Sequence, residues 1–296
     1  MKVHFAGLEQ KDYAVILNKV AGINCRLFTV FPFIAKQFGI KPMILTSTLP
    51  DVGDFLTKNM NHCIMDSGLF TLMFGAHAGK RDEKFVRAWQ EAIIKFVKTT
   101  GYKGTVVEVD CQKILGVEMA WELRKQLRKA LPNNQQINVF HIEDGEEGLK
   151  KMARWSKYIA LSIPEFRSLK WKNLPLKVNQ LCNIIKKENP GIKIHLLGCT
   201  QKNIMQNCKF CDSSDSTSWQ QVNRFGTGLI YNNNQYKKIK RSLVEDQSGS
   251  INKEVDRYFK ENKITPTGSN LTYYSNFALT GIYLKQMYSI YAGSQE

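Results

Sequence analysis

The chain has 296 residues, of which 43% are hydrophobic and 11% aromatic, so it can build one substantial core and is not disordered as a whole. Its 42 lysines and arginines against 26 aspartates and glutamates give a formal net charge of +16, which favours a polyanionic partner, although a soluble protein rich in lysine is an equally good explanation. The sequence lacks a signal peptide and any apolar stretch near the about 20 residues of a membrane helix, and its seven cysteines form no regular framework. These features predict a cytoplasmic protein with no membrane partner.

Short apolar runs recur along the chain, and segments of helical period separate them. The runs are KVHFAG from position 2, PMILTS from 42, HCIMDSG from 62, GTVVEVD from 104, INVFHIED from 137, YIALSIP from 158 and KIHLLG from 193, with 210–214 as a candidate eighth. Residues 84–98 predict a helix, because five apolar side chains fall on one face at spacings of three and four. The alternation predicts an α/β fold, a (β/α)8 TIM-like barrel. A doubly wound open sheet is the alternative, but no glycine-rich phosphate loop supports it.

The pattern changes after Arg224. Residues 225–270 are polar, rich in asparagine and basic, and predict an insert or small lobe. Residues 271–296 predict a C-terminal helix that packs on the barrel, because Tyr273, Phe277, Leu284 and Tyr288 lie at near-helical spacing. The barrel itself is assigned to residues 1–224.

Carboxylates close several of the apolar runs. They are Asp66, Asp110, Glu143, Asp144, Asp212 and Asp215. Each one alone is better explained as a helix N-cap, but several together weaken that explanation. The carboxyl ends of barrel strands meet at one rim, where barrel enzymes build their active sites. No metal motif is present, and His141 and His195 sit inside apolar runs, so no metal site is expected.

Six segments occur in the order of corresponding segments in the guanine transglycosylases. They are DSGLFT (66–71), EVDC (108–111), IEDG (142–145), ALS (160–162), HLLGC (195–199) and CDSSDSTSW (211–219). The chain therefore resembles the queuine and archaeosine tRNA-ribosyltransferases and the phage and bacterial relatives that insert 7-deazaguanines into DNA. If the chain is phage-encoded, the resemblance places it in the host cytoplasm.

The resemblance implies a double displacement at C1′ of a guanosine. Asp215 corresponds to the nucleophile, with Asp212 as the fallback, and Asp66 corresponds to the general acid and base. Such chemistry needs one ionised carboxylate near C1′ and one carboxyl group that exchanges protons, and no metal or redox cofactor.

Base recognition is also implied by the resemblance. Asp110 corresponds to the residue that accepts hydrogen bonds from the Watson–Crick edge of guanine, and Glu143 stands where the family has a base-contacting glutamine. Phe70 is a candidate for stacking on the base, although a core role is as good an explanation. The full set assigned to base binding is Asp110, Glu143, Ser67, Phe70, Ala160 and Leu161.

The family's tRNA-modifying members carry a zinc site downstream of the nucleophile, and this chain has no cysteine after Cys211. Cys208 and Cys211 form a C-x2-C pair for which the sequence offers no convincing partners. The predicted substrates are therefore DNA and a free 7-deazaguanine base, such as the 7-cyano form. The expected phosphate-contacting residues are Arg224, Lys237, Lys238, Lys240 and Arg241.

Other functions remain open. The alternatives are a zinc-free tRNA transglycosylase, a non-catalytic nucleic-acid-binding relative, and a glycosidase in which water resolves the covalent intermediate. A homodimer is compatible with the sequence.

Overall fold

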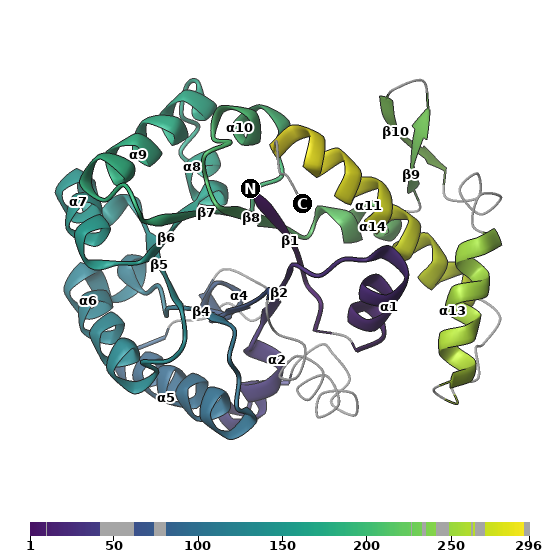
Figure 1. Ribbon diagram of the computed structural model, residues 1–296. Coiled ribbons are helices and arrows are strands. Elements are labelled where there is room, and N and C mark those ends of the chain that lie inside the picture. The colour runs from purple at the N-terminus through teal and green to yellow at the C-terminus, as the bar shows by residue number, and fades with distance from the viewer. Residues whose placement is uncertain are drawn as a thin grey trace.

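The fold is a closed barrel of eight parallel strands surrounded by helices, which confirms the predicted (β/α)8 architecture (Figure 1). The computed structural model describes residues 1–9, 11–41, 62–73, 81–225, 227–232, 235–240, 249–261, 263 and 270–292. The strands are β1 (Lys2–Ala6), β2 (Arg26–Thr29), β3 (Cys63–Asp66), β4 (Thr105–Val107), β5 (Gln136–Phe140), β6 (Tyr158–Ser162), β7 (Lys193–Leu197) and β8 (Ser213–Ser216). Each strand pairs with the next in chain order, and β8 closes the barrel against β1.

The second barrel strand differs from the prediction. Arg26–Thr29 lies between β1 and β3, whereas PMILTS (42–47) lies outside the described residues. The strand is only four residues long and begins with a charged residue, so it lacks the continuous apolar run that marks a buried parallel strand.

Helices alternate with the strands and cover the outside of the barrel. They are α1 (Lys11–Ala21), α2 (Phe31–Ile34), α4 (Leu69–Met73), α5 (Glu83–Thr100), α6 (Gln112–Ala130), α7 (Gly145–Trp155), α8 (Ile163–Ser168), α9 (Leu174–Glu188), α10 (Lys202–Asn207), α11 (Ser218–Arg224), α13 (Gly249–Glu261) and α14 (Asn270–Ala292), with 3-10 turns η1 (Ala35–Phe38) and η3 (Ile142–Asp144). Helix α5 confirms the helix predicted at 84–98, with Trp89 and Ile93 buried against the barrel. No helix in the described part of the chain is long and apolar enough to cross a membrane.

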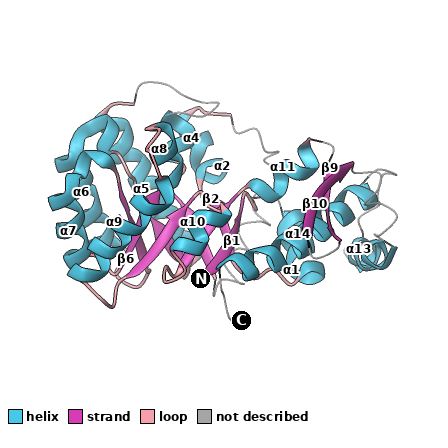
Figure 2. Ribbon diagram, turned by 90° about the horizontal axis from the view of Figure 1, so that it is seen from above, coloured by secondary structure: helices cyan, strands magenta, loops and turns pink. Residues whose placement is uncertain are grey.

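The part of the chain after α11 adds a hairpin and two helices beside the barrel. Strands β9 (Thr227–Asn232) and β10 (Gln235–Lys240) pair antiparallel, and α13 packs on α1 and α14. Both views place the hairpin and α13 on one side of the barrel, beyond α14 (Figures 1 and 2). Phe277, Leu284 and Tyr288 of α14 are buried against β1 and α1, as the helical spacing predicts.

Side chains alternate between the barrel interior and the helix layer. On β6, Tyr158 and Ala160 belong to the interior cluster, whereas Ile159 and Leu161 pack among the outer helices. This period of two determines which residues of each strand can reach the mouth of the barrel at its carboxyl end.

Candidate active site at the carboxyl end of the barrel

Asp66 ends β3 and is held in a tight turn. Its Oδ2 accepts a hydrogen bond of 2.9 Å from the backbone N–H of Gly68. Gly68 has φ +73°, and a Cβ there would lie 2.8 Å from both the Cβ of Phe31 and the Oγ1 of Thr29. The turn therefore requires glycine, for its conformation and for its lack of a side chain.

The environment of Asp66 favours the protonated carboxyl group. Burial and the charges of Asp110 and Asp215, offset in part by the Gly68 hydrogen bond, raise the pKa of Asp66 from 3.8 to about 7. A further acid contributes to this shift, Glu9, which follows β1 and which the sequence analysis did not identify. A carboxyl group with a pKa near neutrality can both donate and accept a proton at physiological pH.

Asp215 lies on β8 and is 6% exposed. Its Oδ1 is 3.0 Å from Nε2 of His195 and accepts a 2.8 Å hydrogen bond from the backbone N–H of Gly198. The other ring nitrogen of His195 is 2.5 Å from Oγ of Ser213. These contacts fix the Asp215 carboxylate in one orientation at the mouth.

Asp212, the fallback nucleophile, lies at the opposite end of the barrel. Its Oδ2 accepts a 2.9 Å hydrogen bond from the backbone N–H of Ile194, and it lines an amino-end cavity of about 510 Å³ with Lys2 and Lys193. Asp212 and Asp215 are three positions apart along the strand, which corresponds to roughly 10 Å at about 3.3 Å per residue. The assignment of Asp212 to the carboxyl-end rim is therefore wrong.

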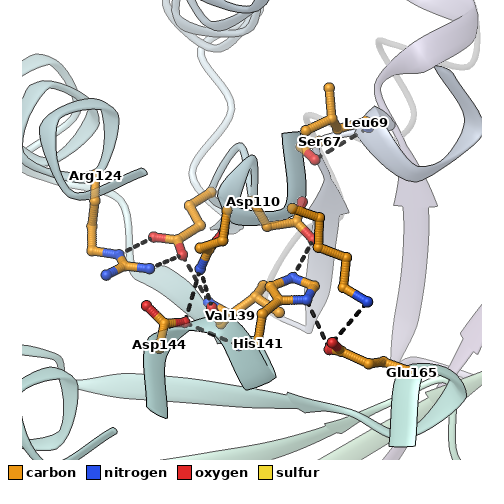
Figure 3. A network of polar contacts seen from close by, with 11 residues as sticks. Ser67, Leu69, Asp110, Arg124, Val139, His141, Asp144 and Glu165 are labelled. Carbon is orange, nitrogen blue, oxygen red and sulfur yellow. Dashed lines mark hydrogen bonds and ion pairs between the residues drawn. The ribbon is translucent and has the colours of Figure 1, made fainter. Parts of the chain in front are cut away.

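Asp110 is joined to a buried imidazole that the sequence analysis missed (Figure 3). Nε2 of His141 is 3.1 Å from the Asp110 carboxylate, and Nδ1 is 2.8 Å from Glu165. Lys113 forms an ion pair of 2.8 Å with the other oxygen of Glu165. Burial alone would lower the pKa of His141, but the hydrogen bonds to the two carboxylates outweigh it and raise the pKa to about 10. At neutral pH, His141 is therefore an imidazolium that holds Asp110 in place.

His141 and His195, which the sequence analysis considered only as metal ligands, both take part in hydrogen-bond networks. Both rings lie between acidic or hydroxyl partners in the described structure. The alternation of β7 carries a usable signal for His195, because its neighbours Ile194 and Leu196 both pack outward. No comparable signal points to Glu165, which is three residues beyond the end of β6.

A second buried network supports the strand that leads to Asp110. Arg124 donates two hydrogen bonds of 2.6 Å to Glu108, and an oxygen of Glu108 accepts a 2.9 Å bond from the backbone N–H of Val139 (Figure 3). Glu108 and Arg124 are 2% and 1% exposed. The network ties β4 to β5 and to α6, and it fixes the backbone two residues before Asp110.

The other residues assigned to base binding divide into exposed side chains and buried ones. Phe70 is 64% exposed on the short helix after the DSG turn, which rules out a core role, and Glu143 is exposed on η3. Ser67 is buried, and its Oγ accepts a 3.3 Å hydrogen bond from the backbone of Leu69. It stays adjacent to Asp66 within the turn.

Ala160 and Leu161 do not line a pocket, and their assignment to base binding is wrong. Both are 0% exposed: Ala160 lies in the interior layer of the barrel and Leu161 lies against the outer helices. Strand β6 continues one residue further, and its half-buried last residue, Ser162, lies closer to the rim.

The described basic residues assigned to phosphate contacts lie outside the eight strands of the barrel. Arg224 ends α11, and Lys237, Lys238 and Lys240 lie on β10 of the hairpin beside α14. Arg241 lies outside the described residues.

Among the described residues, one group has the spacing of a metal site. Ligand atoms of His141, Glu143 and Glu165 lie within 4.8 Å of one another. Both nitrogens of His141 already contact carboxylates, and Lys113 neutralises Glu165, so the positive charge that a metal would supply is provided by side chains. The geometry favours a hydrogen-bonded network over a metal centre.

Comparison with known proteins gives similarity in fold only. No family model and no curated protein matches the chain. Similar solved structures include QR15, described as an aldolase, with a TM-score of 0.43, 10% identity and coverage of 76% of this chain and 95% of that chain. Another is a monomeric dihydrodipicolinate synthase variant, with a TM-score of 0.48, 10% identity and coverage of 99% and 96%.

Proposed function

We propose that the protein is a transglycosylase that exchanges guanine in DNA for a free 7-deazaguanine base such as 7-cyano-7-deazaguanine. The observation that carries the proposal is the meeting of three carboxylates, Asp66, Asp110 and Asp215, from three strands at one mouth, each with different partners. The resemblance of DSGLFT and CDSSDSTSW to guanine transglycosylase motifs adds the substrate class.

In the first half of the reaction, Asp215 attacks C1′ of the deoxyribose. The bond between C1′ and the base breaks, its electron pair moves into guanine, and Asp66 donates its proton to a ring nitrogen so that guanine leaves neutral. A carboxyl group with a pKa of about 7 holds this proton at the start of the cycle.

In the second half, the ionised Asp66 removes the ring N–H proton of the incoming 7-deazaguanine. The freed nitrogen attacks C1′, and the bond from C1′ to Asp215 breaks and returns the carboxylate. The two displacements retain configuration at C1′ and restore both acids, so the cycle needs no further reactant.

Asp110 supplies the selectivity for guanine-like bases in this proposal. A carboxylate accepts from N1–H and from the exocyclic amine, the two donors of the guanine Watson–Crick edge. The imidazolium of His141 holds the Asp110 carboxylate in one orientation, and Phe70 is exposed where a base lifted from the stack could rest.

The test is release of labelled guanine from DNA, and separately from tRNA, in the presence of 7-cyano-7-deazaguanine. Asp215→Asn should reduce release at least 1000-fold, on the order expected for removal of a catalytic nucleophile. Asp212→Asn is the matched control, because it makes the same change in the same motif at the other end of the barrel.

Three results would redirect the proposal. Release from tRNA alone would identify a zinc-free tRNA enzyme, and release without uptake of the analogue would identify a hydrolase. Absence of release from both polymers, with DNA binding retained, would favour a non-catalytic binding protein.

A further inference from the structure

A chain of hydrogen bonds runs through the interior of the barrel to Asp215. Oδ1 of Asp215 is 3.0 Å from Nε2 of His195, and Nδ1 of His195 is 2.5 Å from Oγ of Ser213. Oγ of Ser213 in turn forms a hydrogen bond with the hydroxyl group of Tyr158. Tyr158 and Ser213 both line the amino-end cavity of about 510 Å³. The chain therefore crosses the barrel interior from the amino end to the proposed nucleophile.

The members of this chain are polar side chains at positions that are usually apolar. Their exposed fractions are 0% for His195, 2% for Ser213, 5% for Tyr158 and 6% for Asp215. Branched apolar residues normally fill the interior of such barrels, and a buried polar group costs free energy unless it is hydrogen-bonded. Both nitrogens of His195 and both hydroxyl groups have partners. A fully paired polar network in place of an apolar core indicates a functional role.

The direction of each hydrogen bond follows from the carboxylate. An ionised Asp215 can only accept, so Nε2 of His195 carries the proton in their contact. In a neutral imidazole the other nitrogen, Nδ1, then only accepts, so the hydroxyl group of Ser213 donates to it. The oxygen of Ser213 accepts from the hydroxyl group of Tyr158. One tautomer of His195 and one orientation of both hydroxyl groups thus satisfy all three contacts.

The partners of His195 favour a neutral ring. His141 contacts a carboxylate with each of its nitrogens, and this arrangement supports a positive charge. His195 contacts one carboxylate and one hydroxyl group, and it is fully buried. Burial disfavours a charged imidazole unless nearby negative charges compensate for it. Among its hydrogen-bond partners in the described structure, His195 has no second carboxylate to do so.

The chain also distinguishes the two oxygens of Asp215. The backbone N–H of Gly198 donates a 2.8 Å hydrogen bond to Oδ1, the same oxygen that contacts His195. The hydrogen bonds that Asp215 accepts from the described residues therefore both end on Oδ1. A hydrogen bond stabilises negative charge on the oxygen that accepts it and makes that oxygen a weaker nucleophile. Oδ2 is the oxygen that is better suited to attack C1′.

We propose that Ser213 and Tyr158 are positioning residues that act on Asp215 through His195. Their hydroxyl groups hold His195 as the neutral Nε2–H tautomer, which donates to Oδ1 and leaves Oδ2 for the attack on C1′. The catalytic part of this inference rests on the proposed exchange reaction, whereas the tautomer is a property of the protein alone.

The experiment is NMR of the imidazole nitrogens in the full chain, labelled with nitrogen-15 histidine, at neutral pH and without substrate. We expect Nε2 of His195 to give the signal of a protonated nitrogen and Nδ1 that of an unprotonated one. The signals are assigned by their loss in His195→Gln. A second assignment, which needs no variant, uses cross-peaks to the ring of Tyr158, whose centroid is 6.3 Å from that of His195. An imidazolium or the Nδ1–H tautomer in the unmodified protein would overturn the proposal.

Two serines on β8 provide a matched pair of variants. Ser213→Ala removes the donor to Nδ1, so the Nδ1 signal should move downfield and kcat for base exchange should fall at least about 10-fold, with the KM for the free base changed about 2-fold or less. Tyr158→Phe should have the same effects to a smaller degree. Ser214→Ala should have neither effect, because Ser214 points to the opposite face of the strand and its Oγ has no partner among the described residues.

The outcomes separate this inference from the proposed function. The expected tautomer in a protein that exchanges no base would refute the proposed function alone. Base exchange with a different tautomer, or with the same kcat in Ser213→Ala as in the unmodified protein, would refute the role of the hydrogen-bond chain alone.

Discussion

Replacing Asp66 with asparagine should stabilise the protein more at pH 8 than at pH 5. Burial and the charges of Asp110 and Asp215 raise the pKa of Asp66 from 3.8 to about 7, so the folded state disfavours the carboxylate. The rise of this pKa from 3.8 to about 7 corresponds to about 4 kcal/mol of free energy. Asp66 is half-buried, so water screens part of this cost, and we expect a gain of about 2 kcal/mol at pH 8. Asparagine keeps an oxygen for the hydrogen bond from Gly68.

The pH dependence follows from the direction of the shift. Below pH 3.8 the group is protonated in both states and the penalty is absent. As the pH rises from 3.8 towards 7, Asp66 loses its proton in the unfolded chain but keeps it in the folded protein, so the stability of the wild type falls. The loss of stability is complete above about pH 7, where Asp66 is ionised in both states. Roughly one third of it is present at pH 5.

The assay is urea unfolding of wild type and variant at both pH values, with Glu143→Gln as the matched acid-to-amide control. Glu143 is exposed on the same rim, so its substitution should shift stability by a small and similar amount at pH 5 and pH 8. A difference between Asp66→Asn and wild type that does not grow with pH would refute the electrostatic reasoning. Loss of exchange activity in the same variant would link the unfavourable charge to function.

Further predictions follow from the same site. His141→Gln should raise the KM for the free 7-deazaguanine base about 10- to 100-fold with a smaller effect on kcat, because Asp110 loses a charged hydrogen-bond donor, and steady-state kinetics with saturating DNA would check this. Phe70→Ala should weaken binding of single-stranded DNA about 10-fold or more in fluorescence anisotropy, whereas Phe70→Trp should preserve it, if the exposed ring stacks on a base. Arg124→Met should destabilise the protein by about 3 to 5 kcal/mol in urea unfolding, because it leaves the Glu108 carboxylate buried without its partner, and Glu108→Gln in the same chain should recover part of the loss.

The barrel was predictable because buried parallel strands appear as short, continuous apolar runs. Six of the seven runs named from the sequence correspond to β1 and β3–β7, and the candidate eighth overlaps β8. Strand β2 failed this criterion because it has four residues and starts at Arg26, whose side chain is buried despite its charge. The prediction thus failed where the strand itself departs from the apolar pattern.

The sequence was enough to predict the acids of the site, but not the side chains that hydrogen-bond to them. A carboxylate that closes an apolar run indicates the rim directly, as Asp66 and Asp110 show. A histidine inside a run gives no indication of its partner, because the contact of His141 with Glu165 joins residues 24 positions apart. Asp212 was misplaced because a loop carboxylate before a short strand looks the same in sequence as one after it.

Because the chain is synthesised from its N-terminus, the barrel can close only after β8 has been made and can pair with β1. Strand β1 is made first, and its partner β8 is the last barrel strand to leave the ribosome, with His4 set opposite Asp215 in the pairing. Until then, β1 and β7 are both unpaired edges of an open sheet, and such edges pair readily with other chains. A nascent or truncated chain that ends before Ser213 therefore lacks Asp215 and an intact barrel together, so incomplete translation products cannot carry out half of the proposed chemistry on nucleic acid.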